Sequence, residues 1–364
     1  MKSPVAITAC SLLTPLDRPG GPTTWEALCA GERVGSRTAV AEELLDADRE
    51  MDRSIRLALA AVNRLDVDVR EMHLFCGTSK GPVTTFLAAA NIRSGRPMNE
   101  SQANHIALGV GAMGAMLRDR LNIRGPAHTS VAACSSGLHA LHRAVMAVQR
   151  GECQQALVAA ADASLHPLFE GSFARLGVLS PIDADGVRRC EPFSEKGAGF
   201  FLIEAAAAMV VTNAECGMRN AEGVVADIER TWIGGDSTGI VAIDEQTRTL
   251  RAGLRAFTHS GKPAFVHAHA TGTGHDAYER AAIRTLFPDA PVFSHKKWLG
   301  HSLGAAGLVS VALSAMSHRA GRTPCGAPVK AESRSLTIAQ GFGGHIGIVA
   351  LKSSCAPSPA ADGA

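Results

Sequence analysis

The chain has 364 residues, of which 46% are hydrophobic and 4% aromatic, and 37 are glycines. This length suffices for one large domain or two ordinary ones, and the few aromatic residues argue against a surface that stacks sugars or bases. Lysine and arginine number 36 and aspartate and glutamate 34, giving a net charge of +2 with no long run of one sign. We therefore expect a glycine-rich α/β enzyme and no nucleic-acid partner.

Short apolar runs alternate with amphipathic stretches along the chain, a pattern typical of α/β proteins. Several runs are continuously apolar, as expected for strands buried between layers of helices. The predicted strands are 5–8, 73–76, 156–161, 200–203 with 209–211, 264–266 and 345–351. The longest predicted helices are 52–65, 106–121, 137–150, 276–286 and 304–316. These elements predict layered sheets with helices around and between them.

The cysteines and the N-terminus indicate the compartment. Nine scattered cysteines form no C-x-x-C pair, which argues against a disulfide framework or a zinc site and favours a reducing compartment. The apolar run from Val5 to Leu13 is interrupted by Thr8 and Ser11, which favours a first strand over a signal peptide. No apolar stretch approaches the roughly 18 residues that cross a membrane. We expect a cytoplasmic protein with no metal and no membrane partner.

The strongest local motif surrounds Cys134, in the segment Thr-Ser-Val-Ala-Ala-Cys-Ser-Ser-Gly at 129–137. Apolar residues at 138, 141 and 145 predict a helix, so Cys134 lies on a strand-to-helix turn at a helix N-terminus. There the helix dipole and the free amide groups favour a thiolate. Two alternatives remain at this point: a buried structural thiol, or Ser135 as the nucleophile of a loosened serine-hydrolase elbow.

Two later segments each carry a histidine in a loop of small residues. The first is Val-His-Ala-His-Ala-Thr-Gly-Thr-Gly at 266–274, and the second runs from Lys296 through Gly-His-Ser-Leu-Gly-Ala-Ala-Gly at 300–307. Each follows an apolar run, which suits a loop that delivers an imidazole into a tight site. A cysteine that takes an acyl group and then meets a carbanion needs such donors to hold a thioester carbonyl.

In this order the motifs resemble those of the elongating β-ketoacyl synthases of the thiolase superfamily. The family's Ala-Cys motif matches 133–137, its His-Gly-Thr-x-Thr matches 269–273, and its Lys with Gly-His-x-x-Gly-Ala-Ala-Gly matches 296–307. The Gly-Phe-Gly-Gly loop is at 341–344, and the mid-chain Pro-Phe and Gly-Phe are at 192–193 and 199–200. The resemblance covers the chain from residue 7 to this loop.

The resemblance implies a thiolase-like fold, in which two similar α/β halves form a layered α-β-α-β-α core. A polar stretch at 212–223 suggests the division: an N-terminal half at 1–212 with the nucleophile, and a C-terminal half at 213–352 with both histidines. The tail at 353–364 is of low complexity and is expected to be disordered. A homodimer, or a heterodimer with a second ketosynthase-like subunit, is also implied.

The family mechanism assigns a role to each matched residue. Cys134 accepts an acyl chain from an acyl carrier protein or acyl-CoA, and His269 and His301 bind a malonyl-type extender while it loses carbon dioxide. Two neutral imidazoles that donate hydrogen bonds suffice for this step. Lys296 orients the histidines, by pairing with Glu279. The remaining implied roles are an oxyanion hole of the Cys134 and Phe342 amides, phosphopantetheine contacts by Thr271 and Thr273, and an acyl pocket lined or gated by Phe200 and Phe342. Gly343 is a further predicted substrate-binding residue. No cofactor is implied beyond the phosphopantetheine that carries the substrates.

Several departures from the family pattern limit this interpretation. Gly197 and Ala198 replace Arg-Asp, Ile-Glu-Ala-Ala-Ala at 203–207 replaces a glycine-rich motif, and the loop after Thr273 is one residue short. They suggest a specialised synthase of fatty-acid or polyketide (secondary metabolite) biosynthesis. Two alternatives stay open: acyl transfer from the cysteine without decarboxylation, and a non-catalytic partner subunit that resembles a chain-length factor.

Overall fold

A single mixed sheet organises the molecule. The computed structural model describes residues 3–90, 109–215 and 224–354. Within them, ten strands follow the order β3-β2-β4-β5-β1-β6-β10-β9-β7-β8. The strands are β1 Val5–Leu13, β2 His73–Gly77, β3 Ala127–Ser130, β4 Gln155–Asp162, β5 Ala205–Asn213, β6 Ala226–Gly235, β7 Phe265–His267, β8 Val292–Phe293, β9 Arg334–Gly341 and β10 His345–Lys352.

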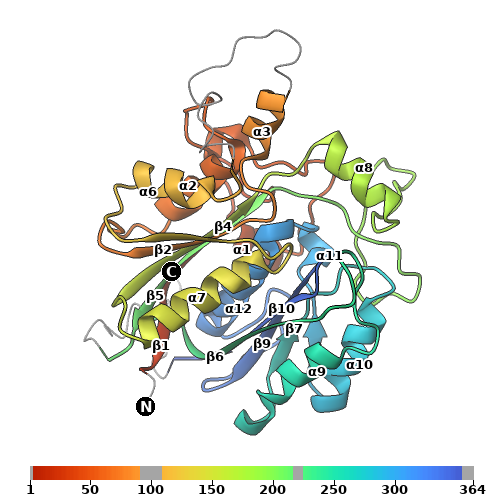
Figure 1. Ribbon diagram of the computed structural model, residues 1–364. Helices are drawn as coiled ribbons and strands as arrows, with labels where there is room; N and C mark the ends of the chain where they lie inside the picture. Colours follow the sequence, from red (N-terminus) through yellow and green to blue (C-terminus); the bar gives the residue numbers. More distant parts are fainter. Residues whose placement is uncertain (1–2, 91–108, 216–223, 355–364) are drawn as a thin grey trace, which may run out of the picture.

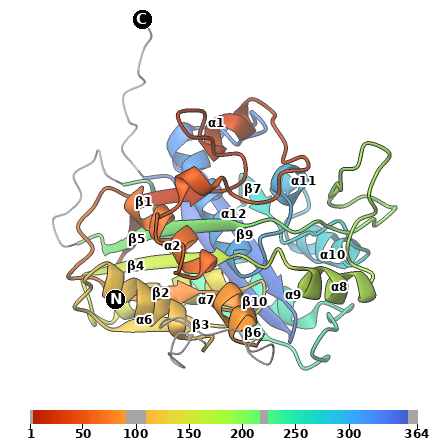
Figure 2. The same cartoon turned by 90° about the horizontal axis from the view of Figure 1, so that it is seen from above.

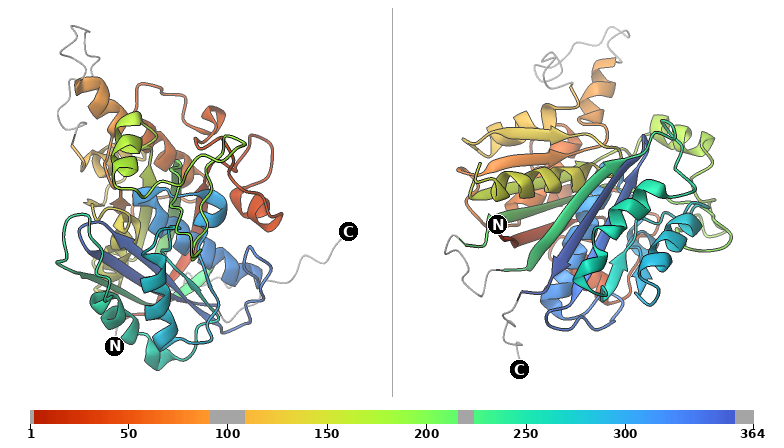
Figure 3. Two further views of the ribbon diagram at one scale, coloured as in Figure 1. Left: turned by 90° about the vertical axis from the view of Figure 1, so that its right-hand side faces the viewer. Right: turned by 60° about the horizontal axis from the view of Figure 1, so that its bottom comes forward.

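The sheet bends where β1 pairs antiparallel with β6, which divides it into two five-stranded parts. We call β3-β2-β4-β5-β1 the first arc and β6-β10-β9-β7-β8 the second arc. Helices α7 and α12 lie between the arcs, α2 and α6 cover the outer face of the first, and α9 and α10 cover that of the second (Figure 1). In the right-hand view of Figure 3, the teal and light-blue helices cover the second arc. This is the predicted α-β-α-β-α order. The helices are α1 Thr24–Cys29, α2 Arg53–Asn63, α3 Val83–Ala90, α6 Ala112–Arg120, α7 Ser136–Gln149, α8 Pro167–Arg175, α9 Arg248–Arg255, α10 Asp276–Leu286, α11 Lys296–Leu299 and α12 Ala306–Ala320.

Small residues let the central helices approach each other and the strands. A Cβ added to Gly137, near the start of α7, would lie 2.9 Å from the backbone nitrogen of Leu308 in α12. One added to Gly77, at the end of β2, would lie 2.8 Å from the backbone of Gly137. Only glycine permits such approaches. The N-terminus of α7 is therefore fixed between the first arc and α12, which sets the position of the residues just before it.

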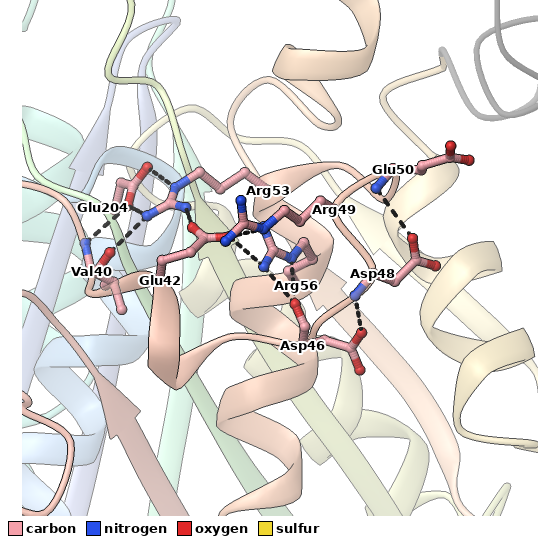
Figure 4. A network of polar contacts seen from close by, with 9 residues as sticks. All are labelled: Val40, Glu42, Asp46, Asp48, Arg49, Glu50, Arg53, Arg56 and Glu204. Carbon is pink, nitrogen blue, oxygen red and sulfur yellow. Dashed lines mark hydrogen bonds and ion pairs between the residues drawn. The ribbon is translucent and has the colours of Figure 1, made fainter.

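A charged network attaches the segment before α2 to the start of β5 (Figure 4). Glu204 is 3% exposed, and its carboxylate accepts bonds from Arg53 Nε at 2.6 Å and Nη2 at 2.8 Å. The same carboxylate accepts the Val40 amide at 3.0 Å, while Arg53 also binds Glu42. Glu204 belongs to the 203–207 segment that departs from the family pattern. It serves here as the buried anchor of the chain between α1 and α2.

The structure corrects some predicted elements. The expected strand at 200–203 is not part of the sheet: it forms isolated bridges that pair Phe200 with Leu179 and Leu202 with His301. The predicted helix at 106–121 starts at Ala112, and its first three residues lie outside the described part of the chain, as do 355–364 of the predicted disordered tail. The division into halves at 212/213 stays a prediction. No described helix is long and apolar enough to cross a membrane.

Candidate active site

Cys134 lies in the turn between β3 and α7 and is 8% exposed. The preceding residue, Ala133, has a φ of +47°, a left-handed conformation that costs energy for a residue with a side chain. Ser136 stabilises this turn, because its hydroxyl accepts the Ala132 amide at 2.8 Å and donates to the Ala133 carbonyl at 2.6 Å. Ser135 is fully buried and its hydroxyl faces the Ala339 carbonyl at 3.4 Å. This burial and orientation disfavour Ser135 as a nucleophile.

The loop at 342–344, between β9 and β10, lies against the turn that carries Cys134. A Cβ added to Gly341 would lie 2.6 Å from the Ala132 carbonyl oxygen and 3.0 Å from the Cys134 amide nitrogen. Gly341 therefore allows the peptide that carries the Phe342 amide to approach the backbone of Cys134. The Phe342 ring stacks on Phe173 of α8, with centroids 6.5 Å apart.

Two buried carboxylates of α10 hold the loop that carries His269. Glu279 accepts the amides of His269 and Ala270, each at 2.8 Å. Asp276 accepts the amide of Thr271 at 2.8 Å and that of Gly272 at 2.9 Å. Four successive backbone donors are thus bound by two acceptors on one helical turn, a charge-assisted arrangement that fixes the loop. The shortened loop after Thr273 keeps these contacts.

Lys296 binds the backbone of the same loop. It is 1% exposed, and its Nζ donates to the His269 carbonyl. Ser294 Oγ donates to the Ala270 carbonyl at 2.9 Å. The expected pairing of Lys296 with Glu279 is not a direct contact: no ion pair joins them within the described residues, and each binds a different backbone group of the loop. Both hold the His269 segment through its backbone; burial lowers the pKa of Lys296, while the nearby Glu279 charge raises it.

His301 follows α11 and is held by the buried segment at 200–203. Its amide donates to the Phe201 carbonyl at 2.8 Å, and its carbonyl accepts the Ile203 amide at 3.2 Å. The Phe200 ring meets the His301 ring edge-on, with centroids 4.9 Å apart, and His301 meets His269 at 5.5 Å. The two imidazoles are therefore neighbours.

One cavity of about 140 Å³ brings most of these side chains together. Its lining includes Cys134, both histidines, Glu279, and the predicted substrate residues Thr271, Thr273, Phe200 and Phe342. Lys296 and Gly343 are absent from the lining: Lys296 lies behind His269, and Gly343 continues the loop beyond Phe342. The rest of the lining divides equally: Phe173, Leu176, Val178, Val241 and Ile243 are apolar, and Thr247, His275, Asp276, Tyr278 and Gln340 carry polar groups.

Burial controls the charge of the site. Burial raises the pKa of the Cys134 thiol to about 11, although Lys80 and Lys296 lower it. This differs from the expected thiolate, because desolvation of the anion outweighs the influence of the helix N-terminus. Burial, aided by the nearby Lys296 ammonium, holds the pKa of His269 and of His301 well below the ordinary value. Both imidazoles are neutral at physiological pH, as expected.

Sequence reasoning missed three residues around the cavity. Phe173 contacts Phe200, with centroids 5.7 Å apart, as well as Phe342. Lys80 Nζ lies 5.6 Å from the centre of the Phe173 ring. Asp162, at the end of β4, accepts the Gly304 amide at 3.2 Å and the Ser79 hydroxyl. None belongs to a motif that the sequence analysis identified. Phe173 is one of two phenylalanines in α8, with Phe169, and its burial is the feature that distinguishes it.

A buried cysteine before a central helix and two histidine loops, on this layered sheet, are the features of a thiolase-like fold. Two family models match the chain: the N-terminal domain of β-ketoacyl synthase at residues 45–216 and its C-terminal domain at 234–329. The chain belongs to the β-ketoacyl synthase family.

Similar proteins are polyketide synthases and ketosynthases. Erythronolide synthase EryA3 of Saccharopolyspora erythraea is 34% identical over 217 residues, which are 56% of this chain and 7% of that protein. Polyketide synthase ThaG of Burkholderia thailandensis is 35% identical over 224 residues, 56% of this chain and 4% of that protein. The chain thus matches only a small part of these large relatives.

Solved structures show the same fold. The ishigamide ketosynthase/chain length factor has a TM-score of 0.82 at 19% identity, covering 97% of this chain and 100% of that one. The oxazolomycin ketosynthase domain OzmH KS7 of Streptomyces albus JA3453 has a TM-score of 0.80 at 19% identity, covering 98% and 75%. These matches confirm the predicted thiolase-like fold.

Proposed function

We propose that this protein is a ketosynthase that joins a cysteine-bound acyl chain to a malonyl-type extender with loss of carbon dioxide. The observation that carries the proposal is the shared cavity of Cys134, His269 and His301, with the Phe342 loop against the nucleophile turn. The family membership agrees with this reaction. The reaction has two halves, loading of Cys134 and carbon–carbon bond formation, and they use different residues.

The first half loads the enzyme. The Cys134 sulfur attacks the carbonyl carbon of a donor thioester, a new carbon–sulfur bond forms, and the donor thiol leaves with the proton of Cys134. The amides of Cys134 and Phe342 would hold the oxyanion, a role worth about 10²–10³ in rate for one donor in other acyl-transfer enzymes. Lys80 and Lys296 favour the sulfur anion at this step, since both lower the pKa of Cys134.

The second half forms the carbon–carbon bond. Neutral His269 and His301 donate hydrogen bonds to the thioester carbonyl of the extender, which stabilise the enolate left when carbon dioxide departs. The enolate carbon attacks the acyl carbon, and the bond to the Cys134 sulfur breaks. The released thiolate takes a proton from water, because burial raises the pKa of this thiol to about 11.

The substrates and partners follow the same reasoning. Thr271 and Thr273, whose hydroxyls are 3.1 Å apart on the cavity wall, would contact the phosphopantetheine arm. The acyl chain would lie against Phe200 and Phe342. We propose a role in polyketide or related specialised fatty-acid biosynthesis, with an acyl carrier protein as donor and a ketosynthase-like subunit as partner. Similar solved structures include a type II PKS acyl-carrier protein in complex with its ketosynthase and a ketosynthase/chain length factor.

The retained cysteine and both histidines favour catalysis over a purely structural partner subunit, which needs no nucleophile. Release of labelled carbon dioxide from a malonyl thioester, measured with and without an acyl donor, tests the proposal. We expect His301→Ala to lose about 10²-fold or more of this release while still forming acyl-Cys134. The control is His259→Ala, which changes an exposed histidine outside the cavity lining. Acyl-Cys134 without carbon dioxide from any extender would instead indicate acyl transfer without decarboxylation.

A further inference from the structure

Behind the cavity, a second pair of histidines is buried where β7, the start of α11 and α12 meet. Figure 2 shows these three elements next to one another. His267 is 0% exposed and His295 is 1% exposed, and neither lines the cavity. Their rings are joined by a hydrogen bond of 3.0 Å between His267 Nε2 and His295 Nδ1. The proposed reaction gives this pair no role.

The hydrogen bonds fix the proton on each ring. The His295 backbone amide donates to His267 Nε2 at 3.3 Å, so this nitrogen carries a lone pair. The proton of the neutral His267 then lies on Nδ1, which faces Ser314 Oγ at 3.1 Å. His295 Nδ1 must be the donor to His267 Nε2, and it also faces Ser310 Oγ at 3.2 Å, whose own proton is donated to the Ala306 carbonyl. Each hydrogen bond of this network therefore has a defined donor, and both rings carry their proton on Nδ1.

One ring atom of the pair has a cost in stability. With its proton on Nδ1, His295 carries a lone pair on Nε2, and no hydrogen-bond donor reaches this buried atom among the residues that the structure describes. An acceptor left in that state costs about 1–3 kcal/mol. An apolar side chain of similar size would avoid this cost.

The pair joins the two segments that carry the proposed catalytic histidines. His267 lies two residues before His269, and His295 immediately precedes Lys296, whose Nζ holds the His269 carbonyl. The one-turn helix that starts at Lys296 leads directly to His301. A shift of His295 would therefore move Lys296 and the start of α11 together.

We propose that His295, through its hydrogen bond to His267, is a positioning residue that sets the placement of Lys296 and of both imidazoles for decarboxylation. This inference rests on the proposed function. Residues that orient a catalytic group through one intermediate contact affect activity by about 10–100-fold in metal sites, and small misplacements in other enzymes have similar effects. The effect should fall on decarboxylation, which uses the histidines, and spare the loading of Cys134.

Two substitutions of His295 separate positioning from packing. His295→Leu removes the donor, whereas His295→Asn keeps a donor close to the position of Nδ1. We expect His295→Leu to load Cys134 within about threefold of the unaltered protein but to release carbon dioxide about 10–100-fold more slowly. His295→Asn should recover most of that loss. Equal losses in both half-reactions, or no loss of carbon dioxide release, would overturn the proposal.

A second measurement is independent of turnover. Hydrogen exchange followed by mass spectrometry should show faster exchange in the peptide covering 267–273 for His295→Leu, and unchanged exchange there for His295→Asn and in α2 for both. Unchanged exchange in 267–273 for His295→Leu would refute the positioning role even if no substrate is turned over. If His295→Leu does not fold, Ser314→Ala, which removes the partner of His267 Nδ1, is compared in the same two assays. If the unaltered protein neither loads nor decarboxylates, the proposed function fails, while the exchange result still decides the positioning role.

Discussion

Gly341→Ala tests whether the Phe342 loop acts on Cys134. The added Cβ would lie 2.6 Å from the Ala132 carbonyl oxygen and 3.0 Å from the Cys134 amide nitrogen, against an ordinary contact of roughly 3.5 Å. The atoms that it meets belong to the backbone of the nucleophile turn, which cannot rotate away. The loop must therefore move outward by several tenths of an ångström.

This displacement should lower both the folding stability and the rate at which Cys134 is loaded, each by its own mechanism. Overpacking of this kind costs about 1–3 kcal/mol of folding free energy. Because the Phe342 amide is proposed to hold the oxyanion, we expect a loss of about 10–100-fold in the rate of acyl-Cys134 formation. The rate is measured by intact mass over time, and the free energy of unfolding by denaturant titration.

The control is Gly274→Ala, also close to the site, where an added Cβ meets nothing within 4 Å. This variant should match the unaltered protein in both measurements. If Gly341→Ala lost 1–3 kcal/mol of stability as expected from overpacking but loaded Cys134 at the full rate, the Phe342 amide would not be an oxyanion donor.

Three further predictions concern charge. Lys296→Met should slow carbon dioxide release. It should also raise the pH at which the rate of release falls on the acid side of its pH profile, because the Lys296 ammonium lowers the pKa of His269 and the reaction needs that imidazole neutral. An unchanged pH profile would contradict this. Arg53→Met leaves the buried Glu204 carboxylate, just before β5, without its guanidinium and should lower the free energy of unfolding by about 3 kcal/mol, whereas changing the exposed Arg49 to alanine should alter it by less than about 0.5 kcal/mol. Burial lowers the pKa of His318 to about 4, so its unfolded form gains a proton first as the pH falls below about 6.5. The free energy of unfolding should then fall by up to about 1.4 kcal/mol per pH unit from this residue until about pH 4, and His318→Asn should reduce that slope.

The sequence predicted those parts of the site that local motifs encode. Cys134, His269 and His301 each stand in a short segment of small residues, and the structure places all three on one cavity. The contacts of Lys296 could not be predicted, because whether it meets Glu279 or a carbonyl depends on the path of a loop one residue shorter than the family pattern. The prediction of a Cys134 thiolate was wrong for a similar reason: burial raises the pKa of this thiol, and burial depends on the tertiary fold.

Strand β6, which the sequence analysis did not predict, shows one limit of the approach. The prediction relied on continuous apolar runs, whereas β6 alternates polar and apolar residues and has a partly exposed face. Conversely, the apolar run at 200–203 is buried without being a sheet strand, because its backbone binds Val178, Ser180 and His301 instead. Phe173 reaches the cavity only through the tertiary placement of α8. An apolar run thus reports burial but not the partner of its hydrogen bonds.

The central claim is a thioester on Cys134. Intact mass after incubation with a panel of acyl-carrier and acyl-CoA thioesters, followed by peptide mapping, tests it most directly. We predict a gain of one acyl group on Cys134, none on the exposed Cys325, and none in Cys134→Ala. No gain with any donor, or an acyl group that persists in Cys134→Ala, would contradict the claim.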